Sequence, residues 1–383
     1  MLKMRKIHIL VFSLVFLLGC KDAYFVDLPG PSAGYLVVEG FILANAETTI
    51  QLSRTGPLRD SVFVRPERRA SVMVFSESGQ AQSLVEFSPG VYSNTLSIDP
   101  AQKYRLVINA GGKEYVSAYS TMLNTPAIDS ISWQKENEGL QFYVNAKGNN
   151  DSKYYTWSFD ETWEINSAYV GSLKYVNAGM PNVKVDYKFP NMEQDFSIYR
   201  CWQFNNSRAI KVASTEKLTE NVVYFPIHFI EPQSIKLGVM YSMLLKQYAL
   251  SENAYRFLVQ MRNNSEQLGT IFDAQPSEAI GNIVCTTAPG EIVIGYVEVT
   301  QQQVFRNFVT RGQVTPWGYR SGCSEIVVEN ISDSIIAKAG SLLPVNPVDI
   351  TRNNDILTFS ATAISCLDCT TLGTNIKPDY WPR

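Results

Sequence analysis

Five cysteines in the second half of the sequence are the residues best placed to do chemistry. Cys366 and Cys369 form a Cys-x-x-Cys pair, and Cys201, Cys285 and Cys323 precede them. Four of these thiols could bind a zinc ion, or they could form two disulfides in an oxidising compartment. A redox Cys-x-x-Cys opens a helix in a βαβ unit, and the sequence predicts neither here. Several pairings are possible, so spacing alone leaves the connectivity open.

The first twenty residues indicate export and lipid attachment. Three basic residues are followed by an apolar stretch over residues 9–18, which is too short to span a bilayer. Gly19 directly before Cys20 matches the bacterial lipobox, in which the cysteine sulfur receives diacylglycerol and becomes the new N-terminus. The alternative is an ordinary signal peptide with a chance cysteine. We predict a signal peptide over residues 1–19 and a lipidated tether over residues 20–33.

Composition excludes several classes of function. Lys+Arg 33 against Asp+Glu 36 gives a net charge of −3, and removal of the three basic residues of the signal peptide takes it to −6. Such a chain has no broad basic surface for nucleic acid or anionic lipid. The mature chain keeps one histidine, His228, and histidine is the usual acid–base group near neutral pH. We therefore expect a protein that binds rather than catalyses, without a metal or other cofactor.

The positions of apolar residues predict a mainly β fold. Residues 34–124 contain short alternating strands separated by turn residues, a pattern typical of an immunoglobulin-like β-sandwich. Pro126 marks a boundary, and residues 125–383 form a larger β-rich domain with one or two short helices. One helix is expected near residues 252–265, because Ser251 is a good N-cap and apolar residues then recur with helical spacing.

Aromatic residues alternate along a predicted strand that includes Trp157 and Trp163. Tyr155, Trp157, Phe159 and Trp163 fall on one face of that strand. An exposed row of this kind suits sugar rings or a peptide, so Trp157 and Trp163 are candidate ligand contacts. The same pattern is also typical of an aromatic sandwich core, which is the more common arrangement.

Carboxylates in the same strand raise the possibility of hydrolysis. Glycoside cleavage uses a pair of carboxylates, and Asp160 and Glu164 share one face of the strand while Glu161 points to the other. His228 lies between apolar neighbours, where a structural hydrogen bond is the common role. No Gly-x-Ser-x-Gly elbow, phosphate-binding loop or His-Glu-x-x-His helix is present. No catalytic residue is predicted.

Three Asp-Ser-apolar tripeptides resemble the acceptor of bacterial O-glycosylation found in Bacteroidetes. They place candidate acceptors at Ser61, Ser130 and Ser334. Tripeptides of this kind occur by chance, so only an exposed serine could be modified.

A series of short strings occurs in order along the chain. They are Leu17-Leu-Gly-Cys20, Leu36-Val-Val-Glu-Gly40, Ala127-Ile-Asp-Ser-Ile-Ser-Trp133, Tyr154-Tyr-Thr-Trp157, Glu161-Thr-Trp163, Cys201-Trp202, Tyr241 to Tyr248, Ser251-Glu-Asn-Ala-Tyr255, Gly281-Asn-Ile283, Gly295-Tyr296, Cys366-Leu-Asp-Cys369 and Pro378-Asp-Tyr-Trp381. Together they resemble a Bacteroidetes family of outer-membrane lipoproteins of undefined function that are associated with TonB-dependent receptors. Cys201, Cys366 and Cys369 belong to these strings and Cys285 does not. We therefore expect disulfides among Cys201, Cys323, Cys366 and Cys369, with Cys285 as the odd thiol.

The resemblance implies a location and a partner. It implies a lipid anchor in the outer membrane, and Lys21-Asp22 after the lipidated cysteine resembles a signal for the cell surface. The expected function is that of a non-catalytic accessory or ligand-binding partner of a TonB-dependent receptor. The alternatives are a structural or adhesive surface lipoprotein without a transporter partner and, less favoured, a peptide or glycan hydrolase.

Overall fold

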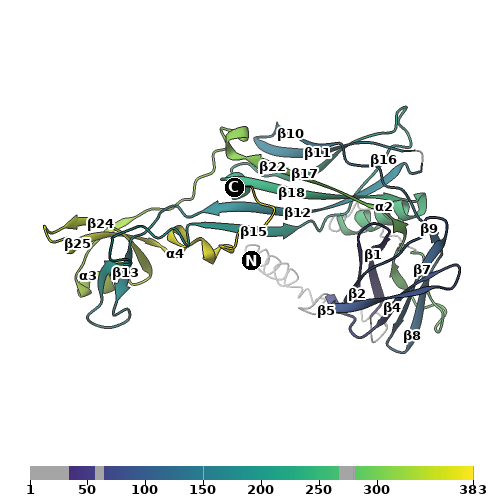
Figure 1. Ribbon diagram of the computed structural model, residues 1–383, viewed down its shortest axis with the longest axis horizontal. Coiled ribbons are helices and arrows are strands. Elements are labelled where there is room, and N and C mark those ends of the chain that lie inside the picture. Colours follow the sequence, from purple (N-terminus) through teal and green to yellow (C-terminus); the bar gives the residue numbers. More distant parts are fainter. Residues whose placement is uncertain (1–33, 57–63, 150, 267–278, 280, 383) are drawn as a thin grey trace, which may run out of the picture.

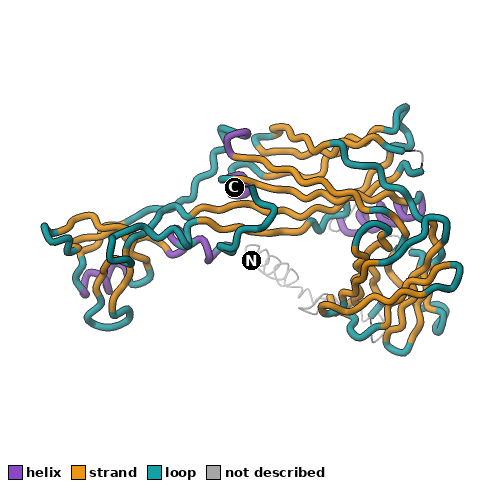
Figure 2. Tube along the Cα trace, viewed as in Figure 1, coloured by secondary structure: helices purple, strands orange, loops and turns teal. Residues whose placement is uncertain are grey.

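The computed structural model describes residues 34–56, 64–149, 151–266, 279 and 281–382. The protein is mainly β, and its helices are short (Figure 2). An elongated molecule contains an N-terminal sandwich, a central sandwich and a smaller distal lobe (Figure 1). The predicted signal peptide, the tether with Cys20 and the acceptor Ser61 lie outside the described residues, so they stay predictions.

The N-terminal sandwich consists of short alternating strands, as the sequence predicts. Leu36 and Val38 of β1 are buried in its core, whereas Val37 and Glu39 face outward, because successive strand residues point to opposite sides. Its first nine strands are β1 (Leu36–Leu43), β2 (Glu47–Thr55), β3 (Val64–Pro66), β4 (Ser71–Ser76), β5 (Ala81–Ser88), β6 (Val91–Thr95), β7 (Lys103–Ala110), β8 (Lys113–Ser117) and β9 (Ser120–Thr121).

Three further strands complete this sandwich from a distant part of the chain. β19 (Ile283–Cys285) pairs antiparallel with β8, and β20 (Val293–Gly295) and β21 (Val299–Thr300) pair parallel with β1. The range 34–124 expected from the sequence therefore lacks part of the sandwich. An unpaired sheet edge exposes backbone donors and acceptors, and the returning segment pairs those of β1 and β8.

A charged cluster connects residues 283–300, which we call the returning segment, to the first strands of the N-terminal sandwich. Arg54 Nε lies 2.6 Å from Glu67 Oε2, and Tyr115 donates a hydrogen bond of 2.6 Å to Glu291 Oε1. Lys113 also pairs with Glu291. Burial and the bond to Glu291 raise the pKa of Tyr115 to about 12, so its hydroxyl remains a donor at neutral pH.

The central sandwich packs a three-stranded sheet, β10-β11-β17, against a five-stranded sheet, β15-β12-β18-β22, in which β16 also pairs with β12. The two sheets share one hydrophobic core. Their strands are β10 (Ser130–Glu136), β11 (Gly139–Lys147), β12 (Tyr154–Asn166), β15 (Arg200–Asn206), β16 (Lys211–Ser214), β17 (Val222–Ile230), β18 (Met240–Leu250) and β22 (Gln302–Thr310).

The aromatic row of β12 belongs to this core. Trp157 is 2% exposed, stacks on Phe225 and donates from Nε1 to Gln247 Oε1 at 2.8 Å. The expectation that Trp157 contacts a ligand is therefore wrong, and the core alternative is confirmed. Trp163 is also buried, and its ring packs against Lys236, whose Nζ lies 5.0 Å from the ring centroid. Trp163 also lines an open hollow beside Trp202 and Phe204, so a ligand contact at Trp163 stays a prediction.

The distal lobe has its own small hydrophobic core, so residues 125–383 contribute to the central sandwich, to this lobe and, through β19–β21, to the N-terminal sandwich rather than forming the one domain expected. Phe359 and Ile335 lie at the centre of this core. The elements of the lobe and its base are β13 (Leu173–Val176), β14 (Lys184–Tyr187), β23 (Ile326–Glu329), α3 (Ser332–Ala339), β24 (Leu342–Ile350), β25 (Ile356–Ala363), α4 (Ile364–Leu367) and η3 (Cys369–Thr371).

The predicted helix is confirmed as α2 (Glu252–Glu266), which lies at the junction of the two sandwiches (Figure 1). Ser251 caps it, because its Oγ accepts a hydrogen bond from the backbone N–H of Ala254 at 3.2 Å. Two short 3₁₀ helices flank the strands of the central sandwich, η1 (Ile235–Leu237) and η2 (Arg311–Val314). Every helix in the described ranges is too short or too polar to cross a bilayer.

Two disulfides join the distal lobe and the C-terminal segment to the central sandwich. Cys201 of β15 is bonded to Cys369 of η3, and Cys323 is bonded to Cys366 of α4. Cys285 is a free, buried thiol. The four disulfide cysteines and the odd thiol expected from the sequence are confirmed. Because all four thiols are oxidised, they do not form the alternative zinc site.

Candidate functional site

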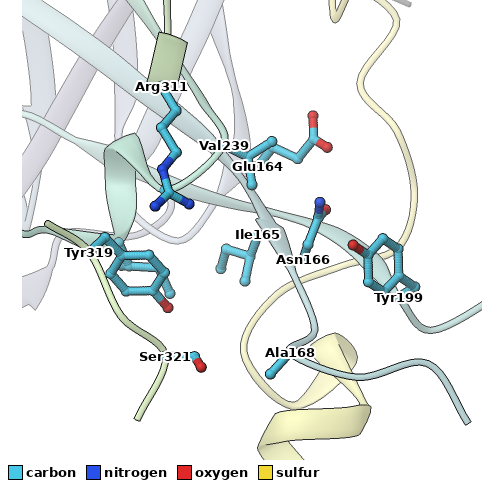
Figure 3. Close-up of a pocket in the computed structure, with 11 residues that line it drawn as sticks. Glu164, Ile165, Asn166, Ala168, Tyr199, Val239, Arg311, Tyr319 and Ser321 are labelled. Carbon is cyan, nitrogen blue, oxygen red and sulfur yellow. The ribbon is translucent and has the colours of Figure 1, made fainter. Parts of the chain in front are cut away.

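The candidate site is a pocket of about 450 Å³ where β12 leaves the central sandwich for the distal lobe (Figure 3). We call it the neck pocket. It combines polar, aromatic and aliphatic side chains, which is typical of small-molecule sites. Its lining residues are Glu164, Ile165, Asn166, Ala168, Tyr199, Ile235, Gly238, Val239, Arg311, Tyr319 and Ser321.

Five segments position these side chains, among them Tyr199 just before β15 and the loop that carries Tyr319 and Ser321. The C-terminal end of β12 supplies one wall, and η1 with the residues after it supplies another. Arg311 begins η2, and its backbone N–H donates to Val239 O at 2.9 Å, which ties η2 to the η1 wall. A Cβ on Gly238 would lie 3.0 Å from the ring of Tyr319, so the absence of a side chain at Gly238 allows the ring to lie flat against that wall.

The polar groups of the neck pocket include two without a protein partner. The guanidinium of Arg311 forms no ion pair or hydrogen bond with any residue in the described part of the chain, and Asn166 Oδ1 is buried without a hydrogen-bond partner. Figure 3 shows Arg311 and Tyr319 on one side of the pocket and Asn166 and Tyr199 on the other. Burial raises the pKa of Tyr319 despite the opposing effect of Arg311, so its hydroxyl is a hydrogen-bond donor at neutral pH.

Glu164 is the carboxylate of the neck pocket, and its oxygens are already engaged. Arg200 Nε lies 3.0 Å from Oε1, and Trp381 donates from Nε1 to Oε2 at 3.0 Å. Asp160, on the same face of β12, pairs instead with Lys246 at 2.7 Å. The predicted division of the carboxylates between the two faces of the strand is therefore confirmed. Each carboxylate has a cationic partner, and neither is paired with a nucleophile.

A buried charged cluster lies behind the η1 wall of the neck pocket. Its centre is Glu161, which is 1% exposed. Lys236 Nζ of η1 lies 2.7 and 2.8 Å from its two oxygens, and His228 Nε2 lies 2.9 Å from Oε1. Tyr241 donates to Oε1 at 2.8 Å, and Asn205 donates to Oε2 at 3.0 Å. Glu161 thus links η1 to three strands of the central sandwich.

The protonation state of this cluster follows from its contacts. Burial opposes ionisation of Glu161, but His228 and Lys236 outweigh it and lower its pKa to about 2. Burial and the neighbouring carboxylate raise the pKa of Tyr241, so it stays a phenol and donates to Glu161. His228 Nε2 lies beside Glu161 but makes no hydrogen bond within the described residues, so the structural hydrogen bond expected for His228 stays a prediction.

The remaining predicted site residues lie away from the neck pocket. Ser130 is exposed on β10, whereas Ser334 is half-buried in α3 and donates to Glu329 Oε2 at 2.9 Å. Arg311 and Tyr319 were missed by the sequence reasoning. Arg311 begins η2, and Tyr319 lies in the irregular backbone between η2 and Cys323. No periodic pattern or motif marks a functional side chain in this stretch.

The geometry describes a tandem β-sandwich protein with a polar pocket at its neck. The chain belongs to a family described as a domain of unknown function (DUF4249), whose profile matches residues 21–306. The matched range includes β12 and η1 of the neck pocket but ends before Arg311 and Tyr319.

Comparisons with individual proteins give little further information. No curated protein matches the chain significantly. A segment of two fibronectin type-III domains from chicken tenascin is 12% identical, and the match covers 55% of this chain and 88% of that one with a TM-score of 0.17. Native E. coli alpha-2-macroglobulin is 9% identical, and the match covers 61% of this chain and 14% of that one with a TM-score of 0.17.

Proposed function

We propose that this protein is a lipid-anchored, non-catalytic binding protein of the bacterial outer membrane, displayed at the cell surface beside a TonB-dependent receptor. The lipobox cysteine Cys20 supports the anchor, and the resemblance to receptor-associated lipoproteins supports the partner. The observation that carries the binding function is the polar lining of the neck pocket. Among the described residues, the buried Asn166 Oδ1 has no hydrogen-bond partner there and the exposed guanidinium of Arg311 has no ion-pair partner.

The chemistry of the neck pocket favours a small anion that carries hydroxyl groups. A guanidinium binds a carboxylate through two parallel hydrogen bonds. A ligand carboxylate paired with Arg311 in this way would neutralise the positive charge of its guanidinium. Asn166 Oδ1 would accept from a ligand hydroxyl, and the hydroxyls of Tyr199 and Tyr319 would bond further polar groups. Aromatic rings also pack well against sugar rings. A sugar acid combines these properties.

Replacing Arg311 by glutamine tests the ligand class. We expect glucuronate to bind the wild-type protein and glucose to bind about tenfold more weakly or not at all, because glucose lacks the carboxylate. The Arg311→Gln variant is expected to lose about tenfold or more of the glucuronate affinity, measured by isothermal titration calorimetry. Arg320→Gln removes an exposed cation outside the pocket and is the matched control. Equal glucuronate binding by wild type and Arg311→Gln would contradict a ligand role for Arg311.

Replacing Cys20 by serine tests the anchor. The wild-type protein is expected in the outer-membrane fraction with a mass that includes the lipid, whereas the Cys20→Ser variant cannot be acylated and should leave that fraction. Labelled protein extracted in mild detergent from its native cell should co-purify with a TonB-dependent receptor. An unlipidated wild-type mass would refute the anchor. Absence of any receptor from the purified material would favour the adhesive alternative.

A further inference from the structure

A second hollow of about 310 Å³ lies at the junction of the two sandwiches, remote from the neck pocket in the fold. We call it the interdomain crevice. Strand β1 forms one wall and α2 forms the opposite wall, with Tyr296 between β20 and β21. Residues from three of the motifs quoted above line this crevice. They come from Leu36–Gly40 of β1, from α2 after Ser251, and from Gly295-Tyr296.

Glycines bring these motifs together. A Cβ on Gly295 would lie 2.5 Å from Val38 O, and a Cβ on Gly281 would lie 1.8 Å from Gly295 O. Only glycine permits such close approach of backbones, so β20 can lie directly against β1. This pairing places Tyr296 beside the outward face of β1 and fixes the shape of the crevice.

The lining of the crevice is mostly apolar and aromatic, and Thr156 and Ser158 of β12 add two hydroxyl groups. Its apolar residues include Phe257, Leu258 and Met261 of α2 and Val37 and Phe41 of β1. The ring centroids of Phe257 and Tyr296 are 5.8 Å apart, and Phe41 stacks on Tyr248 at 4.9 Å. Domain junctions with such linings are common sites for small ligands.

One carboxylate interrupts this apolar surface. Glu39 lies between Val37 and Phe41 on the outward face of β1 and stands at the mouth of the crevice. Within the residues that the structure describes, its carboxylate forms no ion pair and no hydrogen bond. Glu39 is an exposed residue, and the partial burial of its carboxylate among apolar residues raises its pKa. A cation would complement this charge, and the aromatic rings would add a cation–π attraction.

We infer that the interdomain crevice binds a small organic cation with an apolar tail, whose ammonium group lies against Glu39 and the aromatic rings while its tail lies along α2. This site is independent of the neck pocket and of the anionic ligand proposed there. The two hollows therefore take ligands of opposite charge.

The test uses the full-length protein and a matched set of short probes. These probes are butyltrimethylammonium, butanol and butanesulfonate, which share a tail and differ in head-group charge. Their binding is measured by saturation-transfer NMR titration. We expect butyltrimethylammonium to bind most tightly, and Glu39→Gln to weaken it about tenfold or more while leaving butanol unchanged. Glu77→Gln removes an exposed carboxylate of the same sandwich and should have no effect.

Three outcomes would overturn the inference. They are absence of butyltrimethylammonium binding, equal binding of the cation and butanol, and equal binding of the cation by wild type and Glu39→Gln. A thermal melt of the variant shows that it is folded, and glucuronate binding shows that the neck pocket is intact. Failure at the crevice is therefore separable from failure of the proposed function.

Discussion

Replacing Glu161 by glutamine is expected to lower the free energy of unfolding of the central sandwich by about 3 kcal/mol. Removal of one member of a buried ion pair leaves its partners without compensation, which costs about 3–5 kcal/mol in other proteins. Lys236 and His228 are each 21% exposed, so we expect the lower end of that range. All six tryptophans lie outside the N-terminal sandwich, so urea unfolding followed by tryptophan fluorescence reports on the affected part.

The pH dependence follows from the direction of the pKa shift. The pKa of Glu161 falls from its ordinary value of 4.5 to about 2 in the folded protein. Its contribution is therefore fully present above pH 4.5 and is lost as the pH falls toward 2. A shift of this size corresponds to about 3 kcal/mol. The difference in stability between wild type and Glu161→Gln should shrink over this interval of pH.

Asp160→Asn is the matched control for Glu161→Gln. Asp160 is the preceding residue of the same strand, but it faces solvent, and its pair with Lys246 is 38% and 28% exposed. Surface pairs contribute about 0–1 kcal/mol, so this variant should unfold close to wild type at every pH. Equal effects of the two substitutions would show that the cluster around Glu161 does not stabilise the sandwich.

Replacing both Cys201 and Cys369 by alanine is expected to cost about 2–5 kcal/mol. The disulfide closes a loop with a sequence separation of 168 residues, and it holds η3 against the edge of β15. Without it, the unfolded chain gains conformational freedom and the C-terminal segment loses its covalent attachment. The measurement is the same urea titration, performed without reductant.

Cys285→Ala is the control for the disulfide variant. It removes a buried thiol that has no disulfide partner, and it should leave both disulfides intact in a mass measurement after alkylation of free thiols. Its cost should stay near 1 kcal/mol, because a small side chain is lost from the core. If the double variant unfolds at the same urea concentration as the wild type, the Cys201–Cys369 bond adds nothing to stability.

The sequence predicts those parts of the fold that depend on local patterns. Neighbouring residues determine the alternation along β1 and β12, the N-cap at Ser251 and the turns of the N-terminal sandwich. The structure confirms the predicted alternation and the N-cap. The set of four disulfide cysteines is also correct. Their pairing could not be predicted, because Cys366 and Cys369 are close in sequence but bond to different partners.

The rest depends on contacts between distant segments. Nothing near residue 293 indicates that β20 pairs with β1, and nothing near Glu161 identifies Lys236 or His228 as its partners. Arg311 becomes a candidate only in the folded structure, where no acidic side chain among the described residues pairs with its guanidinium. Local patterns therefore predicted the strands and the helix, while the two candidate sites required the three-dimensional arrangement.

The returning strands also determine the order in which the chain can assemble. During synthesis the N-terminal strands emerge first, yet the outer edges of β1 and β8 have no partners until residues 283–300 follow. Unpaired edges promote association between chains, and contacts of long sequence separation form slowly. All strands of the central sandwich except β22 lie in the sequence between residues 124 and 283. A fragment that ends at residue 124 therefore leaves the outer edges of β1 and β8 unpaired. The N-terminal sandwich is complete only after most of the central sandwich has been synthesised, although the two have separate cores.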